Sequence, residues 1–286
     1  MHNPIGLTAR LPRFVPAVAM ACALGLVVPA SAFAAAPATG DITNTQAGQT
    51  AATLAAQRLT RVGHPTTAAS LRVIREANGT TKTMPKGMAT TTGAGTDGAT
   101  VSGVVLQAPS STRALGSLSP MSGAQYWNQI NNGCLSETKS QGWMYNCWSL
   151  KKMYNGYSNY DFFILTFDGT AYSNGSGMHI SYVEVTKNSS SAPFTVVDWS
   201  PKSNPPGSNC HTITLSVSYI LGFSMDSTQC ENWAVYADPI NHPGTQYSEW
   251  YLIGTVYNDA RETTLVQEVE TAKNARPIWN LYYDFQ

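Results

Sequence analysis

Aromatic side chains are almost missing from the first part of this sequence. All seven tryptophans and all fourteen tyrosines lie at or after Tyr126. Residues 35–99 are instead rich in Ala, Thr, Gly and Ser, and short stretches with helical spacing occur only over 51–62 and 67–77. Such a composition offers little apolar surface to offset the entropy of ordering the chain. We therefore expect residues 35–99 to be a largely disordered spacer or pro-segment.

The sequence also has no dense cluster of basic residues. Residues 37–121 carry 7 Lys and Arg against 3 Asp and Glu, whereas residues 122–286 carry 8 against 14. Because nucleic acids are bound by basic surfaces, the acidic C-terminal part excludes nucleic acid as the main partner.

Familiar catalytic and metal-binding motifs are absent. There is no G-x-S-x-G elbow, no C-x-x-C and no H-E-x-x-H, and His179, His211 and His242 are scattered. The sequence therefore predicts neither a metal site nor a cofactor.

Only one long apolar run occurs, and it lies at the start. Arg10 and Arg13 precede an apolar stretch over 14–28, and small residues around Ala34 then offer cleavage sites. We expect residues 1–34 to be a signal peptide and the mature chain to be secreted and extracellular. No later run is long enough to cross a bilayer, so no membrane span is expected after signal removal.

Four of the five cysteines lie beyond this segment, namely Cys134, Cys147, Cys210 and Cys230. An even number in an exported chain indicates disulfides, and four cysteines allow three pairings. We favour Cys134–Cys147 and Cys210–Cys230, because each pair brackets a short segment. Each such link would stabilise the fold by about 3 kcal/mol.

Residues 100–286 carry the pattern of an antiparallel β-sandwich, either jelly-roll or immunoglobulin-like, with one or two short helices. Apolar and polar residues alternate over 211–223, which predicts one strand with a buried face. The run 162–165 is apolar at every position and indicates a central strand, followed by a turn at Asp168-Gly169. The expected strands are 101–106, 144–153, 160–167, 180–186, 194–199, 211–223, 233–237, 247–253 and 278–285.

Two segments favour helices. Ser122 has the chemistry of a helix N-cap, and the helix would bury Tyr126, Trp127 and Ile130. Residues 259–276 start with a capping-box pattern and end at a proline, which predicts a second helix. A strand over 263–271 is the alternative there.

The surplus of aromatic residues suggests a function. Tryptophan combines a flat stacking surface with a polar edge, which suits sugar rings. We expect Trp143, Trp199, Trp233 and Trp250 to include ligand-binding residues, although at least half of the tryptophans should be core. The leading hypothesis is a non-catalytic extracellular binding protein for a polysaccharide or a surface protein.

Two alternatives stay open. A sandwich hydrolase would need two carboxylates roughly 5–9 Å apart, and Glu184, Glu231 and Glu249 are the candidates. A secreted toxin or inhibitor would use residues 35–99 as a removable pro-segment.

Overall fold

The computed structural model describes residues 39–94, 100–109, 125–154, 157, 159–174, 178–202, 211–229, 233–237, 244–254 and 257–285. Within these ranges the chain forms one α-helix, one 3-10 turn and sixteen strands. The helical elements are α1 (Gln46–Arg61) and η1 (Ala68–Ser70). The strands are β1 (Gly40–Asp41), β2 (Leu71–Arg75), β3 (Thr81–Pro85), β4 (Ala89–Ala94), β5 (Thr100–Gln107), β6 (Tyr126–Lys139), β7 (Gly142–Tyr154), β8 (Tyr160–Asn174), β9 (Met178–Lys187), β10 (Phe194–Ser200), β11 (His211–Val217), β12 (Phe223–Gln229), β13 (Trp233–Ala237), β14 (Gln246–Gly254), β15 (Tyr257–Ala272) and β16 (Ile278–Phe285).

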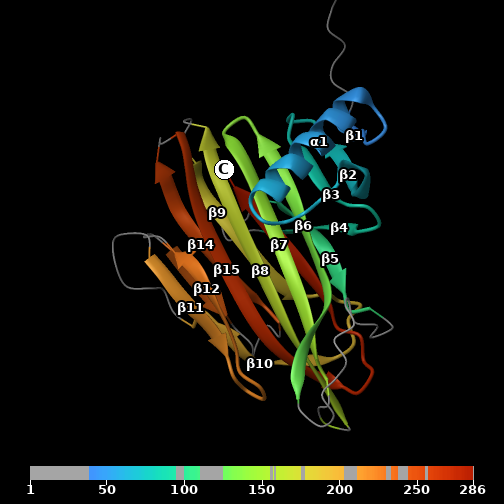
Figure 1. Cartoon of the computed structure of the whole chain (residues 1–286), viewed down its shortest axis with the longest axis vertical. Coiled ribbons are helices and arrows are strands. Elements are labelled where there is room, and N and C mark those ends of the chain that lie inside the picture. The colour runs from blue at the N-terminus through green and yellow to red at the C-terminus, as the bar shows by residue number, and fades with distance from the viewer. Residues whose placement is uncertain are drawn as a thin grey trace, which may run out of the picture. The chain divides into compact units, whose positions relative to one another are not determined.

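The strands form two large antiparallel sheets and one hairpin (Figure 1). Sheet A has eight strands in the order β1-β2-β3-β6-β7-β8-β15-β10, and sheet B has six in the order β13-β14-β9-β16-β5-β4. Strands β11 and β12 pair only with each other within the described residues. The predicted antiparallel β-sandwich is confirmed.

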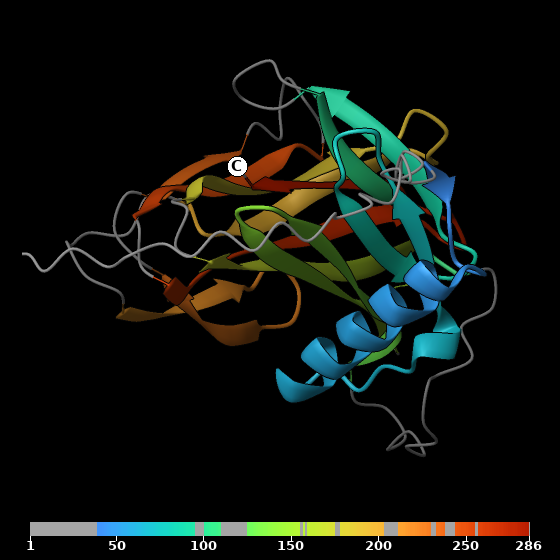
Figure 2. The ribbon, with the colours of Figure 1, turned by 90° about the horizontal axis from the view of Figure 1, so that it is seen from above.

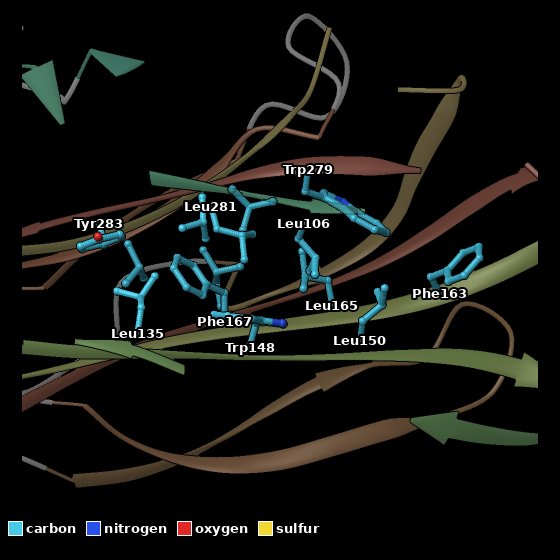
Figure 3. Close-up of a cluster of buried hydrophobic side chains, with 14 of the residues drawn as sticks. Leu106, Leu135, Trp148, Leu150, Phe163, Leu165, Phe167, Trp279, Leu281 and Tyr283 are labelled. Atoms are coloured by element: carbon cyan, nitrogen blue, oxygen red, sulfur yellow. The ribbon is translucent and has the colours of Figure 1, made fainter. Parts of the chain in front are cut away.

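The main core lies between the two sheets (Figure 3). Trp279, Leu281 and Tyr283 point from sheet B toward Leu165 and Phe167 of sheet A. Because side chains alternate across a strand, the odd-numbered residues of this part of β8 enter the core. The even-numbered residues therefore lie on the opposite face of sheet A, which we call the outer face.

Helix α1 and the β11–β12 hairpin cover parts of that outer face (Figure 2). Leu59 of α1 is fully buried against Cys134, Tyr145 and Cys147. On the other side, Leu215 and Val217 of the hairpin pack on Ile164 and Val266, and Trp127 lies beside them. Sheet A therefore has apolar contacts on both faces.

Helix α1 has clear start and stop signals. The Thr45 hydroxyl accepts a hydrogen bond from the backbone N–H of Gly48 (3.1 Å), which caps the first turn. Gly48 has no room for a side chain, because a Cβ would lie 1.9 Å from the carbonyl oxygen of Ile42. Gly63 follows the C-cap with φ +93°, a conformation that favours glycine.

The helix predicted over 259–276 is wrong, and the alternative strand over 263–271 is confirmed within β15. This strand lies between β8 and β10. Leu265 and Val269 enter the main core, whereas Val266 packs against the hairpin. A strand buried on both faces loses its strict alternation, and its apolar residues then resemble a helical pattern.

Two other boundaries also differ. Ser122 lies outside the described residues, but Tyr126, Trp127 and Ile130 belong to strand β6 rather than to a helix. The single strand predicted over 211–223 is two strands, since β11 ends at Val217 and β12 begins at Phe223. Alternation continues through the turn between them, so periodicity alone could not locate the break.

The predicted central strand is confirmed, because β8 lies between β7 and β15 and residues 162–165 are buried. The predicted turn at Asp168-Gly169 is wrong, since both residues lie inside β8. A Cβ on Gly169 would lie 2.6 Å from atoms of Asn146, Met144 and Val183. The glycine is therefore a packing requirement within the sandwich, not a turn signal.

Residues 39–94 form helix α1 and strands β1–β4, and these strands belong to the two sheets. The described part of the expected spacer is therefore ordered. Its small residues pack closely, and Ala52, Ala55 and Ala56 of α1 form a cluster with Leu71 and Val73 of β2. Of the second stretch with helical spacing, 67–77, only Ala68–Ser70 is helical, and strand β2 follows. The boundary at residue 100 and the removal of this segment stay predictions.

None of the helices among the described residues combines the length and the apolar character needed to cross a bilayer.

Candidate functional site

A pocket of about 390 Å³ opens on the outer face of sheet A, beside the end of α1. Its lining is mostly polar and comes from β6, β7, β8 and the segment that follows the helix. The lining residues are Gly63, His64, Pro65, Thr66, Gln129, Asn132, Gly133, Cys134, Cys147, Trp148, Ser149, Thr166 and Asp168.

The register of sheet A brings one row of these residues together. Cys134 of β6 lies opposite Cys147 of β7, and Cys147 lies opposite Asp168 of β8. Directly opposed residues on neighbouring strands point to the same face. The pairing of the strands therefore places the Asp168 carboxyl next to the two cysteines.

Those cysteines form the predicted disulfide, which is confirmed as a pair with S–S 2.06 Å. Leu59 covers it from the helix. Cys210 and Cys230, the second predicted pair, lie outside the described residues. The confirmed disulfide links β6 to β7 and forms part of the pocket floor.

The wall of the pocket follows from the way α1 ends. The left-handed Gly63 turns the chain, and the backbone N–H of His64 donates to the carbonyl oxygen of Leu59 (2.8 Å). The imidazole of His64 then lies 5.9 Å from the ring of Tyr145. Burial lowers the pKa of His64, which keeps its ring neutral near pH 7.

Hydrogen bonds fix several polar groups of the floor. The Ser149 hydroxyl donates to the amide oxygen of Gln129 (3.3 Å), and the Thr166 hydroxyl donates to the carbonyl oxygen of Ser149 (3.4 Å). The Thr66 hydroxyl donates to the carbonyl oxygen of His64 (2.9 Å). These contacts orient the hydroxyl and amide groups of the lining before any ligand arrives.

Asp168 is the carboxylate of the pocket lining, and a second one lies near it. Glu262 is on β15, opposite Thr170, and Asp168 is opposite Thr264, so the two acids are diagonal neighbours on one face. Burial first, and the charge of Glu262 second, raise the pKa of Asp168 to about 8. Burial also raises the pKa of Glu262, which accepts hydrogen bonds from the hydroxyls of Ser227 (3.3 Å) and Thr264 (3.4 Å).

One group in the pocket has the donor atoms of a metal site. The ligand atoms of His64, Cys134 and Cys147 lie within 4.8 Å of one another. The two sulfurs are bonded to each other, however, and a metal ligand must be a thiolate. In this disulfide state, the group does not fit a metal.

Trp143 and Trp199, two of the tryptophans expected to bind ligand, do not line this pocket. Trp143 stacks on Tyr172 with ring centroids 4.4 Å apart, and the guanidinium of Arg58 lies 4.7 Å from the Trp143 ring. Trp199 is half-buried against the main core, with the Lys202 ammonium 5.3 Å from its ring. Both side chains therefore have structural partners.

Trp233 and Trp250 are brought together by the backbone, since they are directly opposed on β13 and β14. Their side chains lie outside the described part of the structure. Whether they bind a ligand stays a prediction.

The structure describes two of the three predicted carboxylate residues, Glu184 and Glu249. Glu184 of β9 is half-buried, accepts a hydrogen bond from the Tyr182 hydroxyl and has its pKa raised by burial. Glu249 of β14 lies opposite Tyr182, and Glu184 lies opposite Tyr247. The register therefore puts Glu184 and Glu249 at diagonal positions on one face of sheet B, and Glu231 lies outside the described residues.

Sequence reasoning missed Asp168 and Glu262. Asp168 was assigned to a turn and Glu262 to a helix cap, although both lie in long strands. A signal was present, because Thr166, Asp168 and Thr170 alternate with Phe167 and Gly169. Such alternation is typical of a strand whose polar side faces away from the core.

No protein-family model matches the chain, and no curated protein matches it. Among solved structures, an alignment with the GH31 alpha-xylosidase from Xanthomonas citri covers 76% of this chain and 31% of that chain, at 8% identity. The TM-score of this alignment is 0.09.

Proposed function

We propose that this protein is a secreted binding protein that holds a polyhydroxylated ligand, such as a sugar residue of a glycan, in the pocket on sheet A. The observation that carries the proposal is the lining, in which hydroxyl and amide side chains surround one carboxyl group. The hydroxyl and amide residues are Thr66, Gln129, Asn132, Ser149 and Thr166.

The size and the chemistry of the pocket support this proposal. A volume of about 390 Å³ is within the range of small-molecule sites. Sugars carry several hydroxyl groups that donate and accept hydrogen bonds, and prearranged amide and hydroxyl groups match them without a large ordering cost. The disulfide further limits movement of the floor.

Binding to a panel of soluble and insoluble glycans tests the proposal. Asn132 is exposed at the pocket, and Asn132→Ala should weaken binding at least tenfold because it removes hydrogen bonds to the ligand. Thr212→Ala, at an exposed position of β11, is the matched control and should bind normally. Binding to no glycan, or equal binding by both variants, would refute the proposal.

A second candidate function is glycoside hydrolysis at Glu184 and Glu249. Its support is the register of β9 and β14, because diagonal neighbours are about 7–8 Å apart, within the range for acid–base pairs. Glu184→Gln and Glu249→Gln should each abolish release of a chromogenic leaving group. A wild-type protein that hydrolyses none of a broad series of glycosides would eliminate this function.

Removal of residues 35–99, as expected for the pro-segment of a toxin or inhibitor, is incompatible with ligand binding in this pocket. This segment supplies His64 and Thr66 to the pocket wall. Glycan binding in the pocket therefore requires a mature chain that begins near Ala35. Intact-mass measurement of the exported protein distinguishes this start from one beyond residue 99.

A further inference from the structure

We infer that the ligand of the pocket carries a positively charged amino group, and that Asp168 binds it. This inference rests on the proposed function and narrows it to amino sugars and related amine-bearing polyols. It depends on the cavity, on its lining and on the charges around Asp168.

The pocket has a carboxyl group, and among the described residues no Lys or Arg lines the cavity. Among the side chains that the structure describes, no salt bridge or hydrogen bond joins Asp168 to a cation. Glu262 lies on the same face and adds negative charge. A half-buried acid in this setting has lost hydration without gaining a counter-charge.

Two described cations, Arg58 and Lys151, have other partners. The Arg58 guanidinium lies over Trp143, and its Nη1 is 3.3 Å from the Thr138 hydroxyl. The Lys151 ammonium lies 4.2 Å from the ring centroid of Phe223 in the hairpin. His64 lines the pocket, but burial lowers its pKa and keeps it neutral. Among the described side chains, none supplies a compensating positive charge to Asp168, and a ligand could supply it.

Two other buried carboxylates, Asp161 and Glu137, have lysine partners. Asp161 is within 3.0 Å of two lysine ammonium groups, those of Lys152 and Lys273. Glu137 is 3.3 Å from the ammonium of Lys139. Asp168 differs from both because it faces a cavity. An ammonium group in that cavity would provide the same charge-assisted hydrogen bond that lysine provides elsewhere.

The protonation state of Asp168 provides a second readout. Its pKa of about 8 means that, in the pocket without ligand, the Asp168 carboxyl group is largely protonated at pH 7. A bound ammonium favours the ionised carboxylate, so binding should release a proton to the buffer. A neutral sugar would release none.

Calorimetry at pH 7 with matched ligand pairs tests the inference. The probes are D-glucosamine against D-glucose and D-galactosamine against D-galactose, with chitosan against chitin as the polymer pair. We expect the amine of at least one pair to bind ten times more tightly than its neutral partner. Titration in buffers of different ionisation enthalpy should show proton release for the amine only.

Two variants separate this inference from the proposed function. Asp168→Asn should remove the amine preference and the proton release, because an amide carries no negative charge and has no acidic proton to lose. Thr212→Ala, outside the pocket lining, is the control and should keep both. Glu262→Gln should reduce the preference only in part. Equal affinity for both members of every pair overturns the inference and leaves the proposed function standing. Absence of binding by all probes and all other glycans refutes both.

Discussion

Two aspartates on the same strand show how differently one sheet treats a buried charge. Asp161, at the start of β8, faces the interior and is 2% exposed. Its carboxylate lies 2.8 Å from the Lys152 ammonium and 3.0 Å from that of Lys273, and it accepts a hydrogen bond from the backbone N–H of Asn274 (2.8 Å). Despite its burial, these contacts lower the pKa of Asp161.

Asp168, further along β8, has the opposite environment. It lies on the outer face and lines a pocket, and the charge of another acid, Glu262, acts on it. Its pKa is raised to about 8. Asp161 thus holds strands and a turn together, whereas Asp168 contributes no such link. A charge that the fold leaves uncompensated is a functional candidate for that reason.

The largest expected effect is a difference in the free energy of unfolding between substitutions at Asp161 and at Asp168. Asp161→Asn should lower the free energy of unfolding by about 3 to 5 kcal/mol, because it leaves the buried Lys152 ammonium without its counter-charge. The isosteric Asp168→Asn should be neutral or stabilising, since the raised pKa of Asp168 means that folding disfavours its ionised form. Urea denaturation monitored by tryptophan fluorescence measures both.

Equal destabilisation by the two substitutions would show that Asp168 has a structural partner after all. A stable Asp161→Asn variant would show instead that the ion pairs at this end of β8 contribute little. Either result would remove the distinction between the two aspartates.

The disulfide lies at the Asp168 end of β8. Its removal should have an effect of intermediate size on the free energy of unfolding. Cys134 and Cys147 are 13 positions apart, and removing a link that closes such a loop costs about 3 kcal/mol. The double variant Cys134→Ala/Cys147→Ala should therefore unfold at lower urea and bind ligand more weakly. Asp161→Asn, which is remote from the pocket lining, is the control and should bind normally when folded.

A double cysteine variant with unchanged ligand affinity would mean that the disulfide does not fix the pocket floor. The comparison between the two ends of β8 would then concern charge alone.

Much of the fold could be predicted from local sequence pattern. The apolar run 162–165 indicated a central strand, and the spacing of Cys134 and Cys147 indicated a disulfide, because both signals depend on nearby residues. Strand β15 was only the alternative to a helix, because the hairpin that buries Val266 comes from another part of the chain. The order of residues 39–94 depends likewise on contacts between alanines and distant strands.

The candidate site was harder to predict than the fold. The pocket joins the end of α1 to three strands of sheet A, and only strand register places Cys147 opposite Asp168. Sequence reasoning favoured the tryptophans because of their chemistry. It could not foresee that the ring of Trp143 would stack on Tyr172. Residue type alone does not reveal which partners a side chain already has.

The remaining prediction sharpens the comparison through pH. The folded-state pKa of Asp168, about 8, exceeds the unfolded value of about 3.8, so the folded protein binds more protons between these values. Asp168 therefore lowers stability progressively as pH rises from about 4 to about 8. Asp161 has a lowered pKa, so its stabilisation is present above about pH 4 and is lost only as pH falls below that value.

The melting temperature of Asp168→Asn relative to wild type should accordingly increase between pH 4 and pH 8. Glu262→Gln should reduce this trend in part, because the charge of Glu262 is the lesser of the two causes that raise the Asp168 pKa. Carboxyl ¹³C NMR titration measures the Asp168 pKa directly in both proteins. An Asp168 that titrates near 4 in wild type would show that solvent already compensates its charge, and the contrast with Asp161 would then have no electrostatic basis.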